Sequence, residues 1–460
     1  MEVNQEQELE RKKEDYEYFY DESNEDDEDD VDSIYTNVLT KNNESKQIPY
    51  LYMLGRRCHP VHDYYERKEY EASLFWWTYR YDFPEIKPYC ITSDAGWGCM
   101  LRSAQMMLTH ALRIHFKSRH WKAETSITKA REDDFVKVLL TWFADFPSTS
   151  QSIYSLHNMC AAGLAKYEVL PGEWYGPGTA CYVMRDLVAL HQQRQTNIFR
   201  VHVSSEGTLY KETIYELMTK DGAKKREQQQ FERRQQQQQQ EEGVEPSHPL
   251  DQVVPELEEL ELKDLEWDTS LLLLIPLRLG LDVFNEEYVQ SVAHIFSLPQ
   301  SVGILGGRPR GARWFYGAYA DGSKILGLDP HTVQSAPNMK EKVQGTKIDN
   351  EKEQCIDLTD EYLASVHTTY PELLDLNRMD PSIALGFYCR NRKDFLDLED
   401  ALTRTNPHSS APKLVSFLDK LPNYMSSDSA NDMMLHDLDD DGVFDDPQDE
   451  ISDEDDYVLL

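Results

Sequence analysis

Apolar residues repeat at a helical period immediately after Cys99. The repeat is carried by five residues: Leu101, Ala104, Leu108, Ala111 and Leu112. Spacings of three and four predict a helix from about Met100 whose apolar stripe faces a core. Further helices are predicted over residues 133–146, about 152–167, and a segment after the Gly/Pro-rich loop 172–178, where Thr179 is a candidate N-cap.

Strand patterns dominate the second half of the chain. Residues 197–205 alternate between apolar and polar positions, and residues 270–280 form a denser apolar run. A helix is predicted around 285–297, and three strand patterns joined by short glycine-containing turns follow it: 301–306, 312–320 and 323–329. Short turns between consecutive strands predict an antiparallel meander. Helices early and strands late indicate an α+β fold rather than a doubly wound sheet.

The negative charge of the chain is concentrated at its two ends. Of a net charge of -36, residues 1–33 carry -13 and residues 426–460 carry -14. Such segments cannot bury enough apolar surface to fold, so we predict disordered acidic tails over 1–46 and 425–460. A nucleic acid is excluded as a partner class because both ends would repel its phosphate backbone.

Between the tails we predict one folded domain, residues 47–424, with an interruption. Residues 221–268 contain long glutamine runs and many charges, for example "QQQFERRQQQQQQEE". This composition predicts a disordered insert in a surface loop rather than a domain boundary, because neither flank completes a fold alone.

Cysteine usage and hydropathy indicate a soluble, reduced, cytoplasmic protein. The seven cysteines are odd in number and show no framework of spacings: Cys58, Cys90, Cys99, Cys160, Cys181, Cys355 and Cys389. The first ten residues do not have the basic and apolar regions of a signal peptide. The densest apolar run, 271–281, is too short to span a bilayer and contains Pro276 and Arg278.

Cys99 is a candidate nucleophile because of where it stands. It follows Gly96, Trp97 and Gly98 and begins the predicted helix. The free N–H groups and the dipole of a helix N-terminus lower the pKa of a thiol. Taken alone, the same position suits a buried, inert cysteine equally well.

Asp329 and His331 are the candidate partners of that thiol. They are two residues apart at the end of a predicted strand, so extended geometry would place both side chains on one face. Pro330 between them restricts both neighbours. A Cys–His–Asp arrangement for acyl transfer follows, in which Asp329 orients the imidazole. The alternative is a turn with a surface histidine, since the chain has 14 histidines.

Several longer segments resemble the autophagins, the autophagy-related cysteine proteases that cleave ubiquitin-like autophagy modifiers after a C-terminal glycine. The resemblance runs in order from about residue 48 to about 420. It is carried by six segments: "FWWTYRYDFP", "TSDAGWGCMLRSAQM", "GEWYGPGT", "LPQSVGILGGRPRGARWFYGAY", "LDPHTVQ" and "PSIALGFYC". Long motifs in the right order are far more specific than one short pattern.

The resemblance implies a fold and a set of site residues. The fold would be a papain-like cysteine protease core with a small additional α/β subdomain. Cys99, Asp329 and His331 match the family's catalytic residues, and Tyr79 matches a tyrosine of its oxyanion site. Two further residues match positions that border the substrate's glycine tail: Trp174 as an aromatic wall and Pro299 in a loop that shields the empty site.

Two short motifs lie apart from this set. Tyr457 and Leu460, behind acidic residues, fit an aromatic-x-x-aliphatic motif that adds a strand to ubiquitin-like autophagy modifiers; Tyr35 with Val38 is a second candidate. "CHPVH" offers Cys58, His59 and His62 to a metal, but no further ligand pair follows at finger spacing, so we predict neither a zinc site nor a cofactor.

The predicted function is that of a cysteine endopeptidase. Its partner would be a ubiquitin-like autophagy modifier, which it would cleave both as a precursor and as a conjugate with phosphatidylethanolamine. Membrane contact would be indirect, through the lipidated substrate. Two other hypotheses stay open: a scaffold that binds the modifier without cleaving it, and a protease for ubiquitin or another modifier.

Overall fold

The computed structural model describes residues 49–195, 197–204, 207–219, 266–308, 311–341, 354–368, 371–404 and 411–422. The predicted tail motifs at Tyr35, Tyr457 and Leu460 lie outside these residues, as does most of the predicted insert 221–268. No helix within the described part of the chain has the length and apolar character needed to cross a membrane.

Helices fill the first half of the described chain, as the sequence predicts. Six come before the main strands: α3 (Tyr64–Ala72), α4 (Cys99–Phe116), α5 (Ile127–Glu132), α6 (Asp134–Phe143), α7 (Leu156–Tyr167) and α8 (Pro177–Arg194). The N-cap of α7 is Ser155, whose hydroxyl accepts a hydrogen bond from the Asn158 N–H. The expectation of a Thr179 cap is wrong, because α8 begins at Pro177 with Gly176 as its N-cap and proline suits the first helical position.

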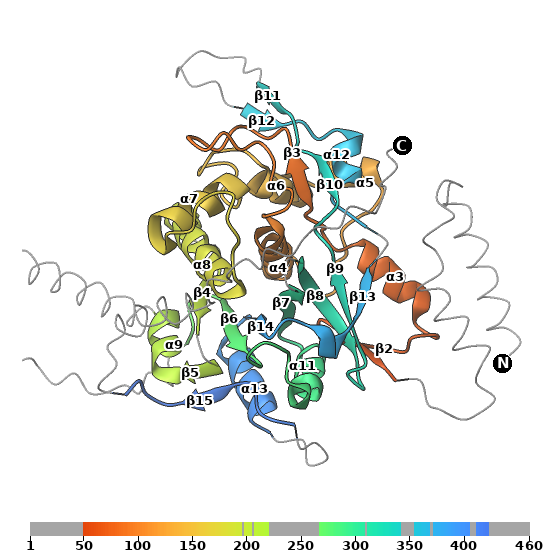
Figure 1. Cartoon of the computed structure of the whole chain (residues 1–460), viewed down its shortest axis with the longest axis vertical. Helices are drawn as coiled ribbons and strands as arrows, with labels where there is room; N and C mark the ends of the chain where they lie inside the picture. Colours follow the sequence, from red (N-terminus) through yellow and green to blue (C-terminus); the bar gives the residue numbers. More distant parts are fainter. Residues whose placement is uncertain are drawn as a thin grey trace, which may run out of the picture.

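A mixed sheet forms the centre of the fold (Figure 1). Its main path runs β13 (Glu372–Asp375), β9 (Lys324–Leu328), β8 (Gly311–Tyr319), β7 (Ser301–Arg308), β14 (Ser382–Cys389), β6 (Leu271–Arg278) and β4 (Arg200–Val203), and the hairpin of β1 (Leu51–Met53) and β2 (Arg56–Cys58) joins β8. Neighbours on this path are antiparallel except β4 and β6. The predicted meander of β7, β8 and β9 is confirmed.

The remaining elements are short ribbons and covering helices. Three two-stranded sheets pair β3 (Tyr79–Tyr81) with β10 (Val333–Ser335), β5 (Thr208–Tyr210) with β15 (Ser416–Leu418), and β11 (Met339–Glu341) with β12 (Gln354–Ile356). The other helices are α9 (Lys211–Met218), α11 (Val289–Ile295), α12 (Asp360–Ala364) and α13 (Arg392–Thr403). One 3-10 turn, Glu286–Tyr288, leads into α11, and another, Leu376–Arg378, lies between β13 and β14.

Both faces of the sheet are buried, and β6 shows how the sequence achieves this. Leu272 and Leu274 belong to the core beneath α4, whereas Leu271, Leu273 and Ile275 belong to the core on the opposite face. Successive side chains of a strand point to opposite faces, so a strand buried on both sides needs a continuous apolar run. The dense run that raised the question of a membrane span is therefore an interior strand of the sheet, paired with β14 on one side and β4 on the other.

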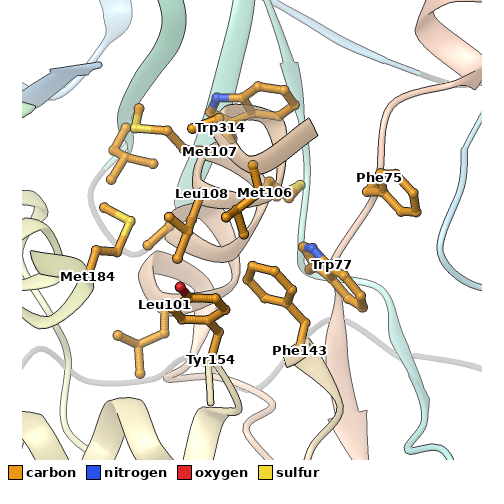
Figure 2. Close-up of a cluster of buried hydrophobic side chains, with 14 of the residues drawn as sticks. Phe75, Trp77, Leu101, Met106, Met107, Leu108, Phe143, Tyr154, Met184 and Trp314 are labelled. Atoms are coloured by element: carbon orange, nitrogen blue, oxygen red, sulfur yellow. The ribbon is translucent and has the colours of Figure 1, made fainter. Parts of the chain in front are cut away.

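Helix α4 is more deeply buried than its stripe predicts. Every residue from Cys99 to Ile114 is buried, because the helix lies between the sheet and the helices α7 and α8. Figure 2 shows Leu101, Met106, Met107 and Leu108 of α4 enclosed by aromatic side chains and a methionine from other elements: Trp77, Phe143, Tyr154, Met184 and Trp314. This packing fixes the position and direction of the helix that begins at Cys99.

Candidate active site

Cys99 is the first residue of α4, as the sequence predicts, and its side chain is only 2% exposed. The turn before it depends on two glycines. Gly96 has a φ of +87°, in the left-handed region that favours glycine. A Cβ on Gly98 would overlap the carboxylate of Asp94. The glycines therefore allow the chain to turn tightly and to deliver the thiol to the free end of the helix.

A buried ion cluster, Asp94–Arg102–Asp145, supports this turn from below. Arg102 donates from Nε to Asp94 at 2.7 Å and from a terminal nitrogen to Asp145 at 3.0 Å. The Asp94 carboxylate also accepts the Arg80 backbone N–H at 2.6 Å, and the Asp94 carbonyl accepts the Gly98 N–H at 2.9 Å. The cluster thus ties the loop before Cys99 to the second turn of α4.

This cluster could not be recognised from the sequence alone. Its signal was an arginine three residues after Cys99, on a helix that is otherwise mostly apolar. Burial alone would lower the pKa of Arg102, but the two carboxylates raise it, so the guanidinium stays charged. Burial raises the pKa of Asp94 against the opposing effect of Arg102; we assign the ionised form because its oxygens accept several N–H groups.

Asp329 and His331 follow β9 and are brought together by a turn. One oxygen of Asp329 accepts both the backbone N–H of His331, at 3.0 Å, and the imidazole Nδ1–H in a shorter hydrogen bond. The pair is therefore formed, although through a turn rather than through the extended geometry that the spacing suggested. The other oxygen of Asp329 accepts from Arg313 at 3.1 Å.

Strand β3 carries Tyr79 to the same place. β3 pairs in parallel with β10, and the Tyr79 N–H donates to the Pro330 carbonyl at 2.9 Å. The rings of Tyr79 and His331 meet edge to face, with centroids 5.3 Å apart. The indole N–H of Trp76 donates to the Asp329 carbonyl at 2.6 Å. The aromatic segment thus fixes both the backbone of the Asp-Pro-His turn and the position of the phenol.

The thiol and the imidazole shift each other's pKa in the directions that an ion pair requires. Burial would raise the pKa of Cys99, but interactions with His331, the Ala312 backbone N–H and the Tyr79 hydroxyl lower it below the ordinary thiol value. The hydrogen bond with Asp329, and then the interaction with Cys99, raise the pKa of His331 to about 9. Nδ1 of His331 is used by Asp329, so Nε2, which is buried and has no other hydrogen-bond partner among the described residues, is the nitrogen left to interact with the sulfur.

The two neighbouring groups keep the protonation states that this chemistry needs. Burial would raise the pKa of Asp329, but the hydrogen bond with His331 and the charge of Arg313 lower it, so the carboxylate is ionised. Burial and the adjacent Cys99 raise the pKa of Tyr79. Its phenol therefore keeps its proton at neutral pH and can donate a hydrogen bond. Ala312, the second residue of β8, is a contact of the thiol that the sequence analysis did not identify.

Trp174 is one of the large exposed apolar residues, with 47% of its surface accessible. Its neighbour Tyr175 is buried and interacts with the Cys160 thiol. Burial and then Asp94 raise the pKa of Cys160 to about 12. A Cβ on Gly172, two residues before Trp174, would come within 3.3 Å of the Ile91 side chain, so this loop packs against the segment that leads to Cys99.

Pro299 is not brought to the site. It is exposed just before β7, and a Cβ on Gly55 of the β1–β2 hairpin would come within 2.8 Å of its Cα. The other end of β7 pairs Gly307 with Ala312, the residue that contacts Cys99. Seven residue steps of strand separate the two ends of β7, roughly 20 Å.

The residues considered as metal ligands, Cys58, His59 and His62, lie at the end of β2 and just after it. In the hairpin region His59 accepts the backbone N–H groups of Val61 and His62 at 3.2 Å each. Burial raises the pKa of Cys58 to about 11. Across the described ranges, no three His, Cys, Asp or Glu side chains are grouped in a way that could hold a metal ion.

Comparison with known proteins places the chain in a family. Residues 65–401 match the peptidase C54 catalytic domain. The cysteine protease ATG4B of Xenopus laevis is 29% identical over 378 residues, which cover 82% of this chain and 85% of the relative. ATG4B of Gallus gallus is 30% identical, covering 77% and 80%, and ATG4A of Mus musculus is 30% identical, covering 70% of each chain.

The matched region contains every element that converges on Cys99, because it runs from the second residue of α3 to the last turn of α13. The mixed α/β architecture, with α4 packed against the sheet, agrees with a papain-like fold. A family domain that covers most of the chain, together with relatives of about 30% identity, supports hydrolase chemistry by a thiol. The chain belongs to the peptidase C54 family, the autophagy cysteine proteases known as autophagins.

Proposed function

We propose that the chain is a cysteine endopeptidase in which Cys99 is the nucleophile, His331 the base and then the acid, and Asp329 the residue that orients the imidazole. One observation carries this proposal: three separate chain segments converge on one thiol, and its pKa is lowered while that of His331 is raised to about 9. Between those two pKa values the thiolate and the imidazolium coexist.

The reaction would proceed in two halves. The Cys99 thiolate attacks the substrate's carbonyl carbon and forms a C–S bond. The C–N bond then breaks, and the imidazolium of His331 gives its proton to the departing amine. Next, His331 takes a proton from a water molecule, which attacks the thioester. The C–S bond breaks, the substrate leaves as a carboxylate and the thiolate is restored.

The developing negative charge on the substrate oxygen would be stabilised by two donors. One is the Tyr79 hydroxyl, which keeps its proton because burial and Cys99 raise its pKa. The other is the backbone N–H of Cys99, which has no partner within α4 because it is the first residue of the helix. Donors fixed before the reaction lower the barrier because they need not reorganise.

The substrate we propose is a ubiquitin-like autophagy modifier in the cytoplasm, cleaved after its C-terminal glycine. A thiol that is only 2% exposed favours a narrow entry, which suits a glycine tail without Cβ atoms, and we propose the exposed ring of Trp174 as one wall of that entry. The amide that joins the glycine to phosphatidylethanolamine would be cleaved by the same steps. Tyr457 and Leu460 of the acidic tail would hold the modifier's folded body by strand addition.

The test is a panel of modifier fusions, autophagy modifiers and ubiquitin among them, incubated with the purified full chain. We expect cleavage after glycine of an autophagy modifier and loss of that cleavage in Cys99→Ala. Cys90→Ala is the matched control, because Cys90 is exposed and outside the site. Unchanged cleavage by Cys99→Ala would contradict the proposal. Binding without turnover would support the scaffold hypothesis, and preferential cleavage of ubiquitin fusions the third hypothesis.

A further inference from the structure

Arg313 connects three adjacent strands at the edge of the sheet where the triad lies. It belongs to β8, Asp329 follows the end of β9, and Glu372 is the first residue of β13. The sheet order is β13, β9, β8, so the guanidinium passes across the end of the middle strand. Arg313 is only 9% exposed, whereas its two carboxylate partners are partly solvated.

Each nitrogen of the Arg313 guanidinium has a partner. Nε and one terminal nitrogen donate to the two oxygens of Glu372, the latter at 3.1 Å. That same terminal nitrogen donates to Asp329 at 3.1 Å, and the other donates to the Gly311 carbonyl at 2.6 Å. The planar fork is thus held in one orientation by Glu372 and Gly311. It presents its remaining hydrogen bond to the Asp329 oxygen that His331 does not use.

We propose that Arg313, itself held by Glu372, is a positioning residue that fixes the Asp329 carboxylate in the orientation needed to hold the His331 imidazole. The inference rests on the proposed function, since it assigns a role within the same triad. Asp329 has its two oxygens pinned from opposite sides, one by His331 and one by Arg313. Loss of either contact would let the carboxylate rotate about its terminal bond.

The charged and titratable groups around this chain of contacts are few in the described structure. Asp329 is faced by Arg313 and His331, and Arg313 by Asp329 and Glu372. His331 is also faced by Cys99 from α4 and by the Tyr79 ring from β3. Removal of Arg313 would therefore leave two carboxylates, Asp329 and Glu372, without the cation between them.

The substitution Arg313→Met tests the role. We expect kcat to fall roughly 10- to 100-fold with little change in KM, because the catalytic groups lose orientation while the substrate surface is intact. Without the guanidinium the pKa of Asp329 rises, so the acid limb of the pH profile moves to higher pH. The hydrogen bond with Asp329 is the largest cause of the raised pKa of His331, so its loss of geometry should outweigh the opposite effect of the missing Arg313 charge, and the alkaline limb should move to lower pH. A purely structural role would lower the plateau and move neither limb.

A second substitution should give a gain of activity, a result that loss of stability alone would not produce. Glu372→Gln in the Arg313→Met background removes the unpaired carboxylate beside Asp329, and we expect this double variant to be more active than Arg313→Met alone. Arg313→Lys should recover part of the profile, since lysine keeps the charge but not the fork. The matched control is Arg404→Met, because Arg404 pairs with Asp400 on the exposed surface of α13. The kcat, KM and pH limbs of Arg404→Met should match those of the parent protein.

Two readouts separate this inference from the proposed function. One is modifier cleavage, and the other is the pH dependence of Cys99 alkylation, followed by the mass of its peptide. Cys99→Ala loses cleavage if the function is right. If it does, but Arg313→Met keeps kcat within twofold and both pH limbs unchanged, the role of Arg313 is refuted and the protease stands. If the parent cleaves no modifier, alkylation limbs that shift in Arg313→Met still support the role, and unshifted limbs refute it. If Arg313→Met fails to fold, the pH limbs of cleavage and of Cys99 alkylation are measured in Arg313→Lys and Glu372→Gln instead. Shifted limbs support the role of Arg313, and unshifted limbs refute it.

Discussion

Two arginines, each set between two carboxylates, lie on either side of Cys99. Arg102 joins Asp94 and Asp145 beneath the turn before the thiol, and all three side chains are at most 4% exposed. Arg313 joins Asp329 and Glu372 at the sheet edge, where the carboxylate side chains are 37% and 30% exposed. The residue types are the same, but in the second cluster one carboxylate, Asp329, also accepts a hydrogen bond from the imidazole of His331.

The two clusters show that groups of the same type have a structural role when they are buried and a role in the chemistry when they contact His331. The buried cluster binds the backbone that positions the thiol, through the N–H of Arg80 and the turn before Cys99, and its ion pairs are at most 4% exposed. The edge cluster passes its influence to the imidazole of His331, whose pKa of about 9 depends first on Asp329. We therefore expect the buried cluster to control stability and the edge cluster to control activity and its pH dependence.

The largest effect that would sharpen this comparison is expected from Asp329→Asn. An amide cannot stabilise the imidazolium and can hold the wrong tautomer, so kcat should fall about 10³- to 10⁴-fold. The unfolding midpoint should barely move, because the site is partly exposed. Steady-state kinetics and urea unfolding check this pair of results. If the kcat of Asp329→Asn stayed within tenfold of the parent value, Asp329 would not be the residue that orients His331.

The next effect concerns stability. Arg102→Met leaves Asp94 and Asp145 buried without a cation, and the free energy of unfolding should drop by about 3–5 kcal/mol. Arg313→Met should cost about 1 kcal/mol or less, because its partners are partly solvated. Urea unfolding of the two variants gives the contrast directly. Equal losses would show that the two clusters are not different in kind.

A smaller effect is expected at the proposed oxyanion site. Tyr79→Phe keeps the ring that packs edge to face on His331 and removes only the hydroxyl. We expect kcat to fall about 10²-fold with KM unchanged, as for the loss of one oxyanion donor. Kinetics on a modifier fusion would check it. If KM rose instead, Tyr79 would be a residue of substrate binding.

The smallest effect is expected at Trp174. Its ring is half-exposed and belongs to neither cluster, so Trp174→Ala should raise KM by less than about tenfold and leave the pH limbs unchanged. Leu164→Ala, another exposed apolar residue, is the matched control. A shift of either pH limb in Trp174→Ala would show that the ring acts on the triad.

The parts of the site that could be predicted from the sequence are those with local signals. Cys99 at a helix start and the Asp-Pro-His turn each lie within a few residues, so glycines and a proline revealed them. The contacts of Arg102 with Asp145 and of Arg313 with Glu372 join residues 43 and 59 positions apart. No period or spacing in one sequence indicates such pairs, because they depend on which strands become neighbours.

The expectation for Pro299 shows the same limit. The family resemblance implied that Pro299 belongs to a loop that shields the site, but it lies at the start of β7, and the other end of that strand pairs with Ala312, which contacts Cys99. Likewise the stripe on α4 predicted one buried face, whereas packing on both sides buried the whole helix. Local pattern determined the elements, and tertiary neighbours determined their surroundings.

The most direct test of the central claim is the pH dependence of Cys99 alkylation with and without His331. In the parent protein we expect a reactive thiolate well below the ordinary thiol pKa of about 8.5, because the imidazolium persists up to about pH 9. In His331→Gln the lowering partner is lost while burial remains, so reactivity near neutral pH should disappear and return only above about pH 8.5. If His331→Gln were alkylated as fast as the parent near neutral pH, Cys99 and His331 would not be a catalytic pair.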